Sequence, residues 1–463
     1  MSEPPSLVKR AALVLGPLFA LVGGWLLVAS GSSYEAGVTL GVTLLCIVWW
    51  MLEPIPIPAT SLIPIAVLPL TGVLPQSQVS EAYGNQLVLL LLGGFILSTA
   101  MEKSGAHLRV ALIMVRAFGG TSSKRLVAGF AVASAMLSMW ISNTATTLML
   151  LPVAMAVIER ARDEKLQVPL LLGVAYAASI GGIGTPIGTP PNVIFMGIYQ
   201  STTGNVVSFT TWMSWGVPVV LVLVPLMVLW VSRGLTYRGT VDLPEVGAWR
   251  SEEKRTLAVF AVTALLWITR SEPLGGWAAL LDVPYTNDGI VALLAVIAMF
   301  LIPNGLGGRL LDWETAERIP WGMLLLFAGG ITIAGAFESS GLSVSIGNAF
   351  AGVATWHTYA VIMTVCLVVT FLTETTSNTA TTALLMPILA AAALGAAIDP
   401  RLMMVPAAMS ASCAFMLPVG TTPNIIVFSS GRFPLSRMVK EGSALNFIGA
   451  FVIGTLCYVL LID

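Results

Sequence analysis

The same six residues, SNTATT, occur twice in the chain, at 142–147 and at 377–382. Each copy continues into apolar residues and a proline, as SNTATTLMLLP (142–152) and SNTATTALLMP (377–387). Both copies lie in sequence that is apolar enough to cross a lipid bilayer, where unpaired polar groups are most costly. Their hydroxyl and amide oxygens, together with free backbone groups at a turn, could coordinate a small hard cation.

Two further segments, GTPIGTPPN (184–192) and PVGTTPN (418–424), combine glycine and proline with polar residues. Because proline removes a backbone donor and clashes with the preceding turn, both segments predict broken helices. A break exposes the carbonyl end of one half-helix, which favours a cation, and the amide end of the next, which favours an anion. An SNT triad that faces such a break would form a cage for one sodium ion and part of an anion site.

Membrane-spanning helices must position these groups. Of the 463 residues, 56% are hydrophobic and 10% are charged, whereas soluble domains carry roughly 25% charged residues. This composition predicts an all-α polytopic membrane protein. Apolar segments near the ~20-residue crossing length predict about eleven spans, at residues 12–30, 36–52, 55–74, 86–101, 170–196, 212–232, 256–269, 288–303, 321–337, 402–428 and 443–461.

The remaining composition argues against several other classes of protein. A net charge of −1 without a basic patch gives no support for nucleic acid as a partner. The four cysteines stand singly in apolar segments and predict small core residues, and the two histidines are far apart, so zinc chemistry is not expected. The chain contains neither HExxH nor GxSxG, which argues against an intramembrane hydrolase.

The distribution of lysine and arginine predicts the orientation. With the N-terminus in the cytoplasm, every basic residue except Arg270 and Arg401 falls in a cytoplasmic loop, as the positive-inside rule requires. The C-terminus then lies outside the cytoplasm, and the predicted location is the cell (inner) membrane. The first apolar segment lacks a small-residue cleavage site, so it is expected to be a span rather than a signal peptide.

This orientation requires that the segment 126–158 begin and end on the cytoplasmic side. As one straight helix it would be about 50 Å long, well beyond the ~30 Å hydrocarbon core, yet it is too short for two crossings and a turn. We therefore expect a re-entrant hairpin with Asn143 near its tip. The segment 358–398, with Asn378 near its tip, predicts a second hairpin that enters from the opposite side.

Three landmarks recur at a nearly constant spacing of about 230 residues. They are the SNT triads, the pair GTPPN and GTTPN, and the Gly-Gly segments LLLLGGFILSTAMEKSG (89–105) and LLLFAGGITIAGAFESSG (324–341). The charge argument gives the two Gly-Gly spans opposite directions, so the sequence predicts two inverted repeats. Inverted repeats with interrupted helices that meet at the membrane midplane are a recurring design of secondary transporters.

Some alternatives stay open. A single SNT triad often serves only for packing and hydrogen bonding between membrane helices, and a single GTPPN is more often a kink; the matched pairs favour a binding site. Glu374 is a separate candidate because carboxylates within membrane segments are rare; it could brace its hairpin or couple transport to protons. Neither hairpin core nor either broken helix contains lysine or arginine. If the substrate is an anion, bound cations and helix amides must therefore balance its charge.

These residues resemble the divalent anion:sodium symporter family, which carries dicarboxylates, citrate and sulfate. The most specific segments are SMWISNTATT (138–147), TETTSNTATT (373–382) and SCAFMLPVGTTPNIIVF (412–428). The resemblance implies a homodimer in the lipid bilayer, with a scaffold domain and a transport domain that moves as an elevator. Many members read ATPPN at the second break, where this chain has Thr422 in place of a proline; that difference could alter substrate choice or the second sodium site.

The resemblance also implies a division of the chain. Scaffold helices and an amphipathic linker would occupy 1–125, and the scaffold helices of the second repeat would occupy 233–345. The transport domain would comprise 126–232, with the hairpin 126–158, the broken helix 170–196 and the helix after it, and 346–463, with the hairpin 358–398, the broken helix 402–428 and the last helix.

The same resemblance implies a set of site residues. The first sodium ion would be held by Ser138, Ser142, Asn143 and Gly188, and the second by Thr373, Thr376, Asn378 and Gly420. The substrate would contact Asn143, Thr144, Thr189, Ser377, Asn378, Thr379 and Thr421. Sodium would be a co-transported ion and not a catalytic cofactor. The preferred function is sodium-driven import of dicarboxylates such as succinate, malate or fumarate; a sodium-independent exchanger, a citrate or sulfate carrier, and a channel are the alternatives.

Overall fold

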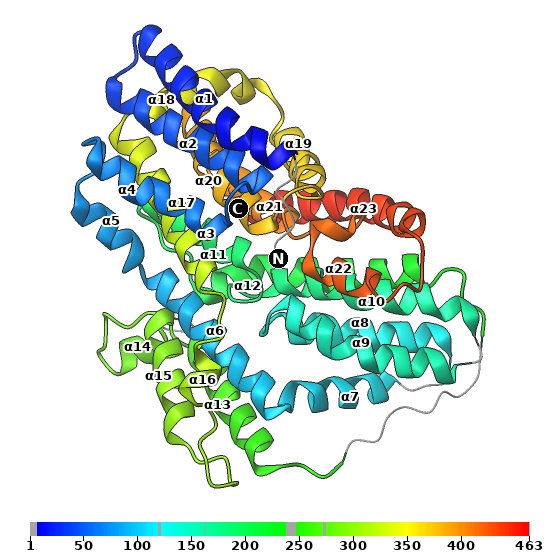
Figure 1. Cartoon of the computed structure of the whole chain (residues 1–463). Coiled ribbons are helices and arrows are strands. Elements are labelled where there is room, and N and C mark those ends of the chain that lie inside the picture. The colour runs from blue at the N-terminus through cyan, green and yellow to red at the C-terminus, as the bar shows by residue number, and fades with distance from the viewer. Residues whose placement is uncertain (1–6, 119–121, 162, 238–246, 272–274, 463) are drawn as a thin grey trace.

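The computed structural model describes residues 7–118, 122–161, 163–237, 247–271 and 275–462, and it is built from helices (Figure 1). Among these residues no strand forms, and the only bridge of the β type is an isolated contact between Pro303 and Arg309. The all-α class predicted from composition is therefore confirmed.

The elements divide into two halves. The first half contains α1 (Leu7–Ala29), α2 (Tyr34–Leu52), α3 (Ile57–Thr60), α4 (Leu62–Leu70), α5 (Gln76–Tyr83), α6 (Gln86–Ser104), α7 (Ala106–Phe118), α8 (Ser123–Ser138), α9 (Asn143–Arg160), η1 (Glu164–Leu166), α10 (Gln167–Gly181), η2 (Gly182–Gly184), α11 (Pro190–Thr203) and α12 (Phe209–Val231). The second half contains α13 (Ser251–Ile268), α14 (Gly276–Leu280), α15 (Asp288–Leu301), α16 (Trp313–Ala316), α17 (Trp321–Ser339), α18 (Leu342–Phe350), η3 (Ala351–Thr355), α19 (Thr358–Leu372), α20 (Asn378–Gly395), α21 (Arg401–Ser410), η4 (Pro418–Gly420), α22 (Thr422–Phe428) and α23 (Leu435–Leu461).

Within the described residues, eight helical segments are long and apolar enough to cross a membrane. They are α1, α2, α5 with α6, α10 with η2, α12, α17, α20 and α23. The segment Ile57–Leu70 and the helices α15 and α19 are apolar but shorter. These helices make the chain a multi-pass membrane protein. The predicted crossing at 256–269 lies in α13, which begins with the charged residues SEEKR and is not among the eight.

Side-chain caps fix where several of these helices begin. Ser33, Asn85 and Ser208 stand immediately before α2, α6 and α12, and each accepts a hydrogen bond from a backbone amide of the first turn. Such caps satisfy amides that have no partner inside the helix. In a membrane, where water cannot replace that partner, the cap determines the first residue of the helix.

The same order of elements occurs in both halves. α6 and α17 carry the Gly-Gly pairs, the short helices α7 and α18 follow them, and each SNT triad starts an 18-residue helix, α9 or α20. Each half continues with an interrupted helix, α10 to α11 or α21 to α22, and ends with a long helix, α12 or α23. The halves meet at their motifs, because α9 contacts α22 and α11 contacts α20 (Figure 1).

The Gly-Gly pairs allow close packing on two sides. A methyl group at Gly93 would lie 2.5 Å from Cβ of Ala292 in α15, and one at Gly329 would lie 2.8 Å from the carbonyl oxygen of Ser61. The second glycine of each pair, Gly94 or Gly330, instead faces residues in or next to the SNT turns and the helix breaks. α6 therefore packs against helices of the second half, α13 and α15, while α17 packs against α2 and α4 of the first.

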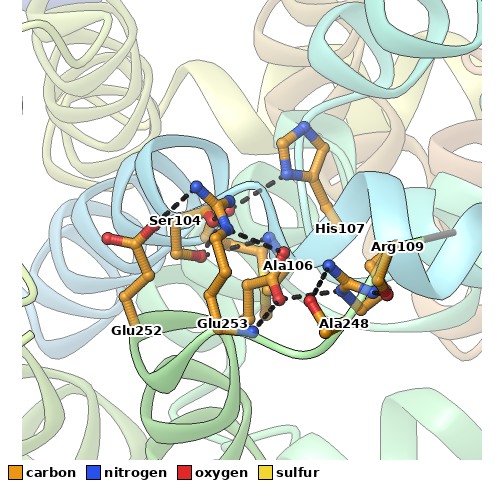
Figure 2. A network of polar contacts seen from close by, with 10 residues as sticks. Ser104, Ala106, His107, Arg109, Ala248, Glu252 and Glu253 are labelled. Carbon is orange, nitrogen blue, oxygen red and sulfur yellow. Dashed lines mark hydrogen bonds and ion pairs between the residues drawn. The ribbon is translucent and has the colours of Figure 1, made fainter. Parts of the chain in front are cut away.

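A buried polar network holds the junction of α6 and α7 against the start of α13 (Figure 2). Arg109 Nε donates to Glu253 Oε2 over 2.8 Å, and Arg109 Nη2 donates to the carbonyl oxygen of Ala248 over 2.8 Å. Arg250 Nη2 donates to the carbonyl oxygen of Ser104 over 2.6 Å. Burial lowers the pKa of His107, an effect partly offset by its 3.0 Å hydrogen bond to the carbonyl oxygen of Met101. The network fixes the angle at which α7 leaves α6.

We expect Arg109→Gln to lower the free energy of unfolding by about 1–3 kcal/mol, because the buried carboxylate of Glu253 loses one charged hydrogen-bond partner and keeps those from Arg250. Burial alone would raise the pKa of Glu253, but hydrogen bonds from the Arg250 amide and from the Arg109 and Arg250 side chains lower it below its ordinary 4.5. A lowered folded-state pKa stabilises the protein above about pH 4.5, and this contribution is lost as the pH falls further.

Thermal unfolding in detergent micelles at pH 7 and at pH 4 measures both effects. Lys254→Gln, a change at an exposed residue next to Glu253 in α13, is the matched control and should leave the midpoint unchanged. An Arg109→Gln midpoint equal to that of the control would contradict the structural role of the network.

Candidate functional site

The first SNT triad forms the turn between α8 and α9. Ser142 caps α9 by accepting a 3.1 Å hydrogen bond from the amide of Ala145. Ser138, the last residue of α8, donates through Oγ to Asn143 Oδ1 over 2.5 Å. Thr147 donates to the carbonyl oxygen of Asn143 over 2.8 Å. The Asn143 side chain is therefore held in one orientation at the start of α9.

The second triad repeats this arrangement at the start of α20. Thr373 Oγ1 lies 2.7 Å from Asn378 Oδ1 and 3.0 Å from the carbonyl oxygen of Ala411. Thr382 donates to the carbonyl oxygen of Asn378 over 2.8 Å. Thr373 and Asn378 thus stand in the relation of Ser138 and Asn143, five residues apart in both copies.

Thr376 lies apart from these groups. Its hydroxyl is 3.0 Å from the carbonyl oxygen of Leu372 and 2.5 Å from Thr381 Oγ1. It lines a small gap of about 10 Å³ beside Trp50 of α2, and it does not line the central cavity described below. Thr376 as a ligand of a cation beside Asn378 therefore stays a prediction.

The two helix breaks are held by equivalent asparagines. Asn192 Nδ2 donates to the carbonyl oxygens of Gly182 and Thr185 over 2.8 and 2.7 Å. Asn424 Nδ2 donates to those of Ala414 and Leu417 over 2.9 and 3.0 Å, at the same sequence offsets. The Oδ1 atoms of both asparagines are buried without a hydrogen-bond partner. In each GTxPN motif the asparagine amide therefore binds the carbonyl oxygens exposed by its own helix break, and the asparagine Oδ1 remains a buried acceptor without a hydrogen-bond partner.

Each turn faces the break of its own half. A methyl group at Gly182 would lie 2.8 Å from Asn143 Oδ1 and 3.2 Å from the carbonyl oxygen of Gly188. In the second half, a methyl group at Gly420 would lie 2.9 Å from Cβ of Ala414 and 3.2 Å from Glu374 Oε2. At the first break, the amide oxygen of Asn143 thus lies close to exposed backbone carbonyls. Such oxygens are suitable ligands for a hard cation.

We expect Gly188→Ala to abolish the transport activity that the sequence predicts, because its methyl group would lie 2.5 Å from the carbonyl oxygen of Gly182, a backbone atom that cannot rotate away. Gly335→Ala is the matched control, since nothing lies within 4 Å of the added methyl group there. Uptake by the two variants in proteoliposomes, normalised to the amount of inserted protein, makes the comparison. Wild-type uptake by Gly188→Ala would argue against a tightly packed oxygen cage at the first break.

Both triads and both breaks line a single cavity of about 520 Å³. The polar residues proposed from the sequence that line it are Ser142, Asn143, Thr144, Gly188, Thr189, Ser377, Asn378, Thr379, Gly420 and Thr421. The N-termini of two 18-residue helices, α9 and α20, lie at this cavity. Their first amides favour negative charge, so the cavity offers neutral oxygens and helix amides together.

The hydroxyls around the cavity are not equivalent. Ser142 and Thr421 accept hydrogen bonds from the backbone at the starts of α9 and α22, whereas Ser377 and Thr189 make no such capping bond. Thr422, which stands where the first half has Pro190, is exposed and lines the cavity too. The two halves therefore present different free hydroxyls to whatever the cavity binds.

The two charged residues that line the cavity, Glu102 and Arg318, were not expected from the sequence. Glu102 ends the line Gly94, Ser98, Glu102 on one face of α6, and its Oε1 lies 3.4 Å from Ser98 Oγ. That four-residue spacing was a signal that could have identified it. Arg318 lies before α17, is exposed, and pairs with Glu314 over 2.8 Å. No feature of the sequence around Arg318 places it at this cavity.

Glu374 is buried and its carboxylate is saturated with hydrogen bonds. Oε1 accepts from the amides of Phe415 and Met416 over 2.7 and 2.8 Å and from Asn446 Nδ2 over 2.7 Å. Oε2 accepts from the amide of Leu417 over 2.9 Å. The carboxylate therefore takes up the backbone donors that the second helix break exposes.

A helical multi-pass membrane protein with matched turns and interrupted helices around one polar cavity has the construction of a secondary transporter. The chain belongs to the citrate transporter family, whose family model matches residues 47–405.

Similar proteins agree with this assignment. The chain is 39% identical to the sodium-dependent dicarboxylate transporter SdcS of Staphylococcus saprophyticus, over 98% of this chain and 91% of that protein. It is 38% identical to SdcS of Staphylococcus aureus strain MRSA252, over 99% and 92%. The crystal structure of the YdaH transporter of Alcanivorax borkumensis shares the fold, with a TM-score of 0.58, 16% identity, and coverage of 89% of this chain and 97% of that one. The comparisons thus describe transporters and not enzymes.

Proposed function

We propose that this protein is a secondary active transporter that couples the import of small di- and tricarboxylate anions, such as succinate, malate or fumarate, to the entry of sodium ions. The observation that supports this most is the single cavity lined by both SNT turns and both helix breaks. The relatives named sodium-dependent dicarboxylate transporters match nearly the whole chain, so the same coupling is the natural proposal here.

The proposed sodium sites follow the two matched oxygen cages. Ser138, Ser142, Asn143 and Gly188 would hold the first ion. Thr373, Thr376, Asn378 and Gly420 would hold the second, and the carbonyl oxygen of Ala411, 3.0 Å from the Thr373 hydroxyl, would lie beside it. The substrate would contact the side chains of Asn143, Thr144, Thr189, Ser377, Asn378, Thr379 and Thr421 from within the cavity.

Electrostatics explains why binding of sodium and of the anion would be coupled. Arg318 lines the cavity at an exposed position and is already paired with Glu314, so the turns themselves offer an anion only neutral donors. Two bound sodium ions beside Asn143 and Asn378 would supply the missing positive charge. By linkage, each ion that raises the affinity for the anion has its own affinity raised by the same factor.

The proposed orientation places the N-terminus in the cytoplasm and the C-terminus outside. Ion pairs support it, because each joins residues assigned to the same side: Lys103 with Asp312 and Arg233 with Glu441 on the cytoplasmic side, and Arg270 with Asp288 outside. Arg162 and Arg238, two of the residues behind this assignment, lie outside the described residues. In this orientation Glu102 and Arg318, two exposed residues that line the cavity, would lie toward its cytoplasmic side.

Further parts of the proposal concern the larger architecture. The helix pairs α8–α9 and α19–α20 would be re-entrant hairpins of two inverted repeats, within a count of about eleven spans. The transport domain would comprise 126–232 and 346–463, and it would move as an elevator against a scaffold formed by 1–125 and 233–345 in each protomer of a homodimer. The packing of α6 against α13 and α15 supports such a scaffold.

Uptake of labelled succinate into proteoliposomes tests the function. We expect rapid, saturable uptake when sodium is added outside, and little uptake when potassium replaces it. Uptake that proceeds equally well without sodium would reject symport and favour an exchanger, and uptake that does not saturate would favour a channel.

Citrate is the second candidate substrate, because the family model that matches residues 47–405 is described as a citrate transporter. Competition with unlabelled citrate and sulfate in the same assay ranks the anions. Stronger competition by citrate than by succinate would move the assignment from dicarboxylates to tricarboxylates.

A further inference from the structure

Three basic residues surround a second cavity at one end of the α12–α23 pair. Lys165, Arg233 and Arg437 line this cavity of about 340 Å³, together with small and apolar residues. Arg233 lies two residues after the end of α12, and Arg437 lies in the first turn of α23. All three are exposed residues.

One buried carboxylate fixes two of these arginines in place. Glu441 Oε2 accepts from Arg233 Nη1 over 2.6 Å, and Glu441 Oε1 lies 3.2 Å from Arg437 Nη2. The Arg233 guanidinium also lies over the Trp230 ring, 3.9 Å from its centroid. Because Glu441 can neutralise only one charge, the three basic side chains and this carboxylate together keep an excess of positive charge.

An apolar groove of about 800 Å³ runs from the same point along the two helices. Its walls are Val222, Leu226, Leu229, Trp230 and Arg233 from α12 and Phe447, Ile448, Phe451, Val452, Thr455 and Leu456 from α23. Arg233 lines both the groove and the basic cavity. Leu229 is 66% exposed, and Phe447 and Phe451 are each 58% exposed, so the groove opens toward the surroundings of the helix pair.

The length of the groove matches one leaflet of a membrane. From Val222 to Val231, its last residue, α12 rises about 14 Å at 1.5 Å per residue, and half of the ~30 Å hydrocarbon core is about 15 Å. A basic end and an apolar body of this length, on the surface of a membrane protein, are complementary to a molecule with an anionic head and an apolar chain.

We propose that an anionic phospholipid binds along α12 and α23, with its phosphate at Lys165, Arg233 and Arg437 and an acyl chain in the groove. A second copy of this chain would have to present a matching acidic and apolar ridge, whereas the surrounding bilayer supplies the head charge and the chain in one molecule. The site is separate from the transport cavity, since the two share no lining residue.

Native mass spectrometry of the purified full-length protein, mixed with equal amounts of phosphatidylglycerol and phosphatidylcholine, tests the proposal. We expect the wild type to retain phosphatidylglycerol preferentially. Lys165→Gln/Arg437→Gln should lower that preference by about tenfold, because each basic residue near a membrane surface contributes measurably to anionic lipid binding. Lys254→Gln, at an exposed lysine away from the groove, is the matched control and should keep the wild-type preference.

Other outcomes would overturn the proposal. Equal retention of the two lipids by the wild type would contradict a head-group site at the basic residues. An unchanged preference in the double variant would contradict it too. Displacement of the lipid by inorganic phosphate alone would show that the groove plays no part. A change of oligomeric state in the double variant, measured by light scattering, would assign the surface to a second copy. If the double variant does not fold, Lys165→Gln alone carries the same comparison, with a smaller expected loss.

Discussion

Asn143→Ala is expected to reach the membrane folded and to lose at least about 100-fold of sodium-driven uptake. In the proposed site the Asn143 side chain supplies an oxygen to the first sodium ion, and Ser138 Oγ holds that oxygen at 2.5 Å. Removal even of residues that only orient ion ligands lowers affinity by roughly 10–100-fold. Asn378→Ala should have the same effect, because Thr373 holds Asn378 in the matching geometry.

The dependence of uptake on sodium concentration distinguishes a loss of ion binding from a loss of folding. Both variants retain the serine that precedes the helix, Ser142 or Ser377, and should elute as wild-type particles from a sizing column. At the highest sodium concentrations we expect partial recovery of uptake if the loss is one of ion affinity. Asn205→Ala, at an exposed position after α11, is the control. Full activity in either site variant would refute the assignment of these cages.

Glu374→Gln is the second change with a large expected effect. Glutamine keeps one acceptor but turns an NH2 group toward either the Leu417 amide or the three donors at Oε1, so at least one buried donor loses its partner. An unsatisfied buried amide costs about 1–3 kcal/mol, and bonds to a charged acceptor are the stronger ones. We therefore expect a drop of about 2–3 kcal/mol in unfolding free energy and at least a tenfold loss of uptake, because the second break shifts.

This experiment also decides between the two roles that the sequence left open for Glu374. A brace predicts that stability and transport fall together and that the pH profile of the remaining uptake is unchanged. Proton coupling predicts normal stability and uptake that no longer responds to pH. Glu338→Gln, at an exposed carboxylate near the end of α17, controls for the loss of a charge and should behave as the wild type.

Local sequence predicted the parts of the site that depend on backbone chemistry. The first SNT triad starts a helix because Ser142 caps it, and Ser377 takes the same N-cap position before α20 without a side-chain bond. GTxPN segments interrupt helices because proline and glycine do not continue them. Asn192 and Asn424 make the same bonds at the same offsets, so a repeated motif encodes a repeated local structure. The membrane-spanning character was predictable for the same reason, since it depends on composition alone.

Contacts between distant segments could not be predicted in this way. Tyr176 of α10 donates to the carbonyl oxygen of Phe415 at the second break, whereas Trp212 of α12 satisfies the equivalent carbonyl of Ile183. Thr376 was assigned by resemblance, yet the direction of its hydroxyl depends on how α20 packs beside Trp50. Arg318 reaches the cavity only because α17 brings it there. Each of these depends on tertiary packing, which spacing along the chain does not contain.

The exchange of partners between α6 and α17 has a consequence for biogenesis. Because Gly93 needs Ala292 and Gly329 needs Ser61 as close neighbours, the half that leaves the ribosome first cannot complete its packing until the later half has been inserted. Until then, the surfaces of the first half that pack against the second half are exposed in the bilayer, and insertion factors would have to shield them. The two halves, synthesised as separate polypeptides in one cell, should therefore accumulate only when both are present.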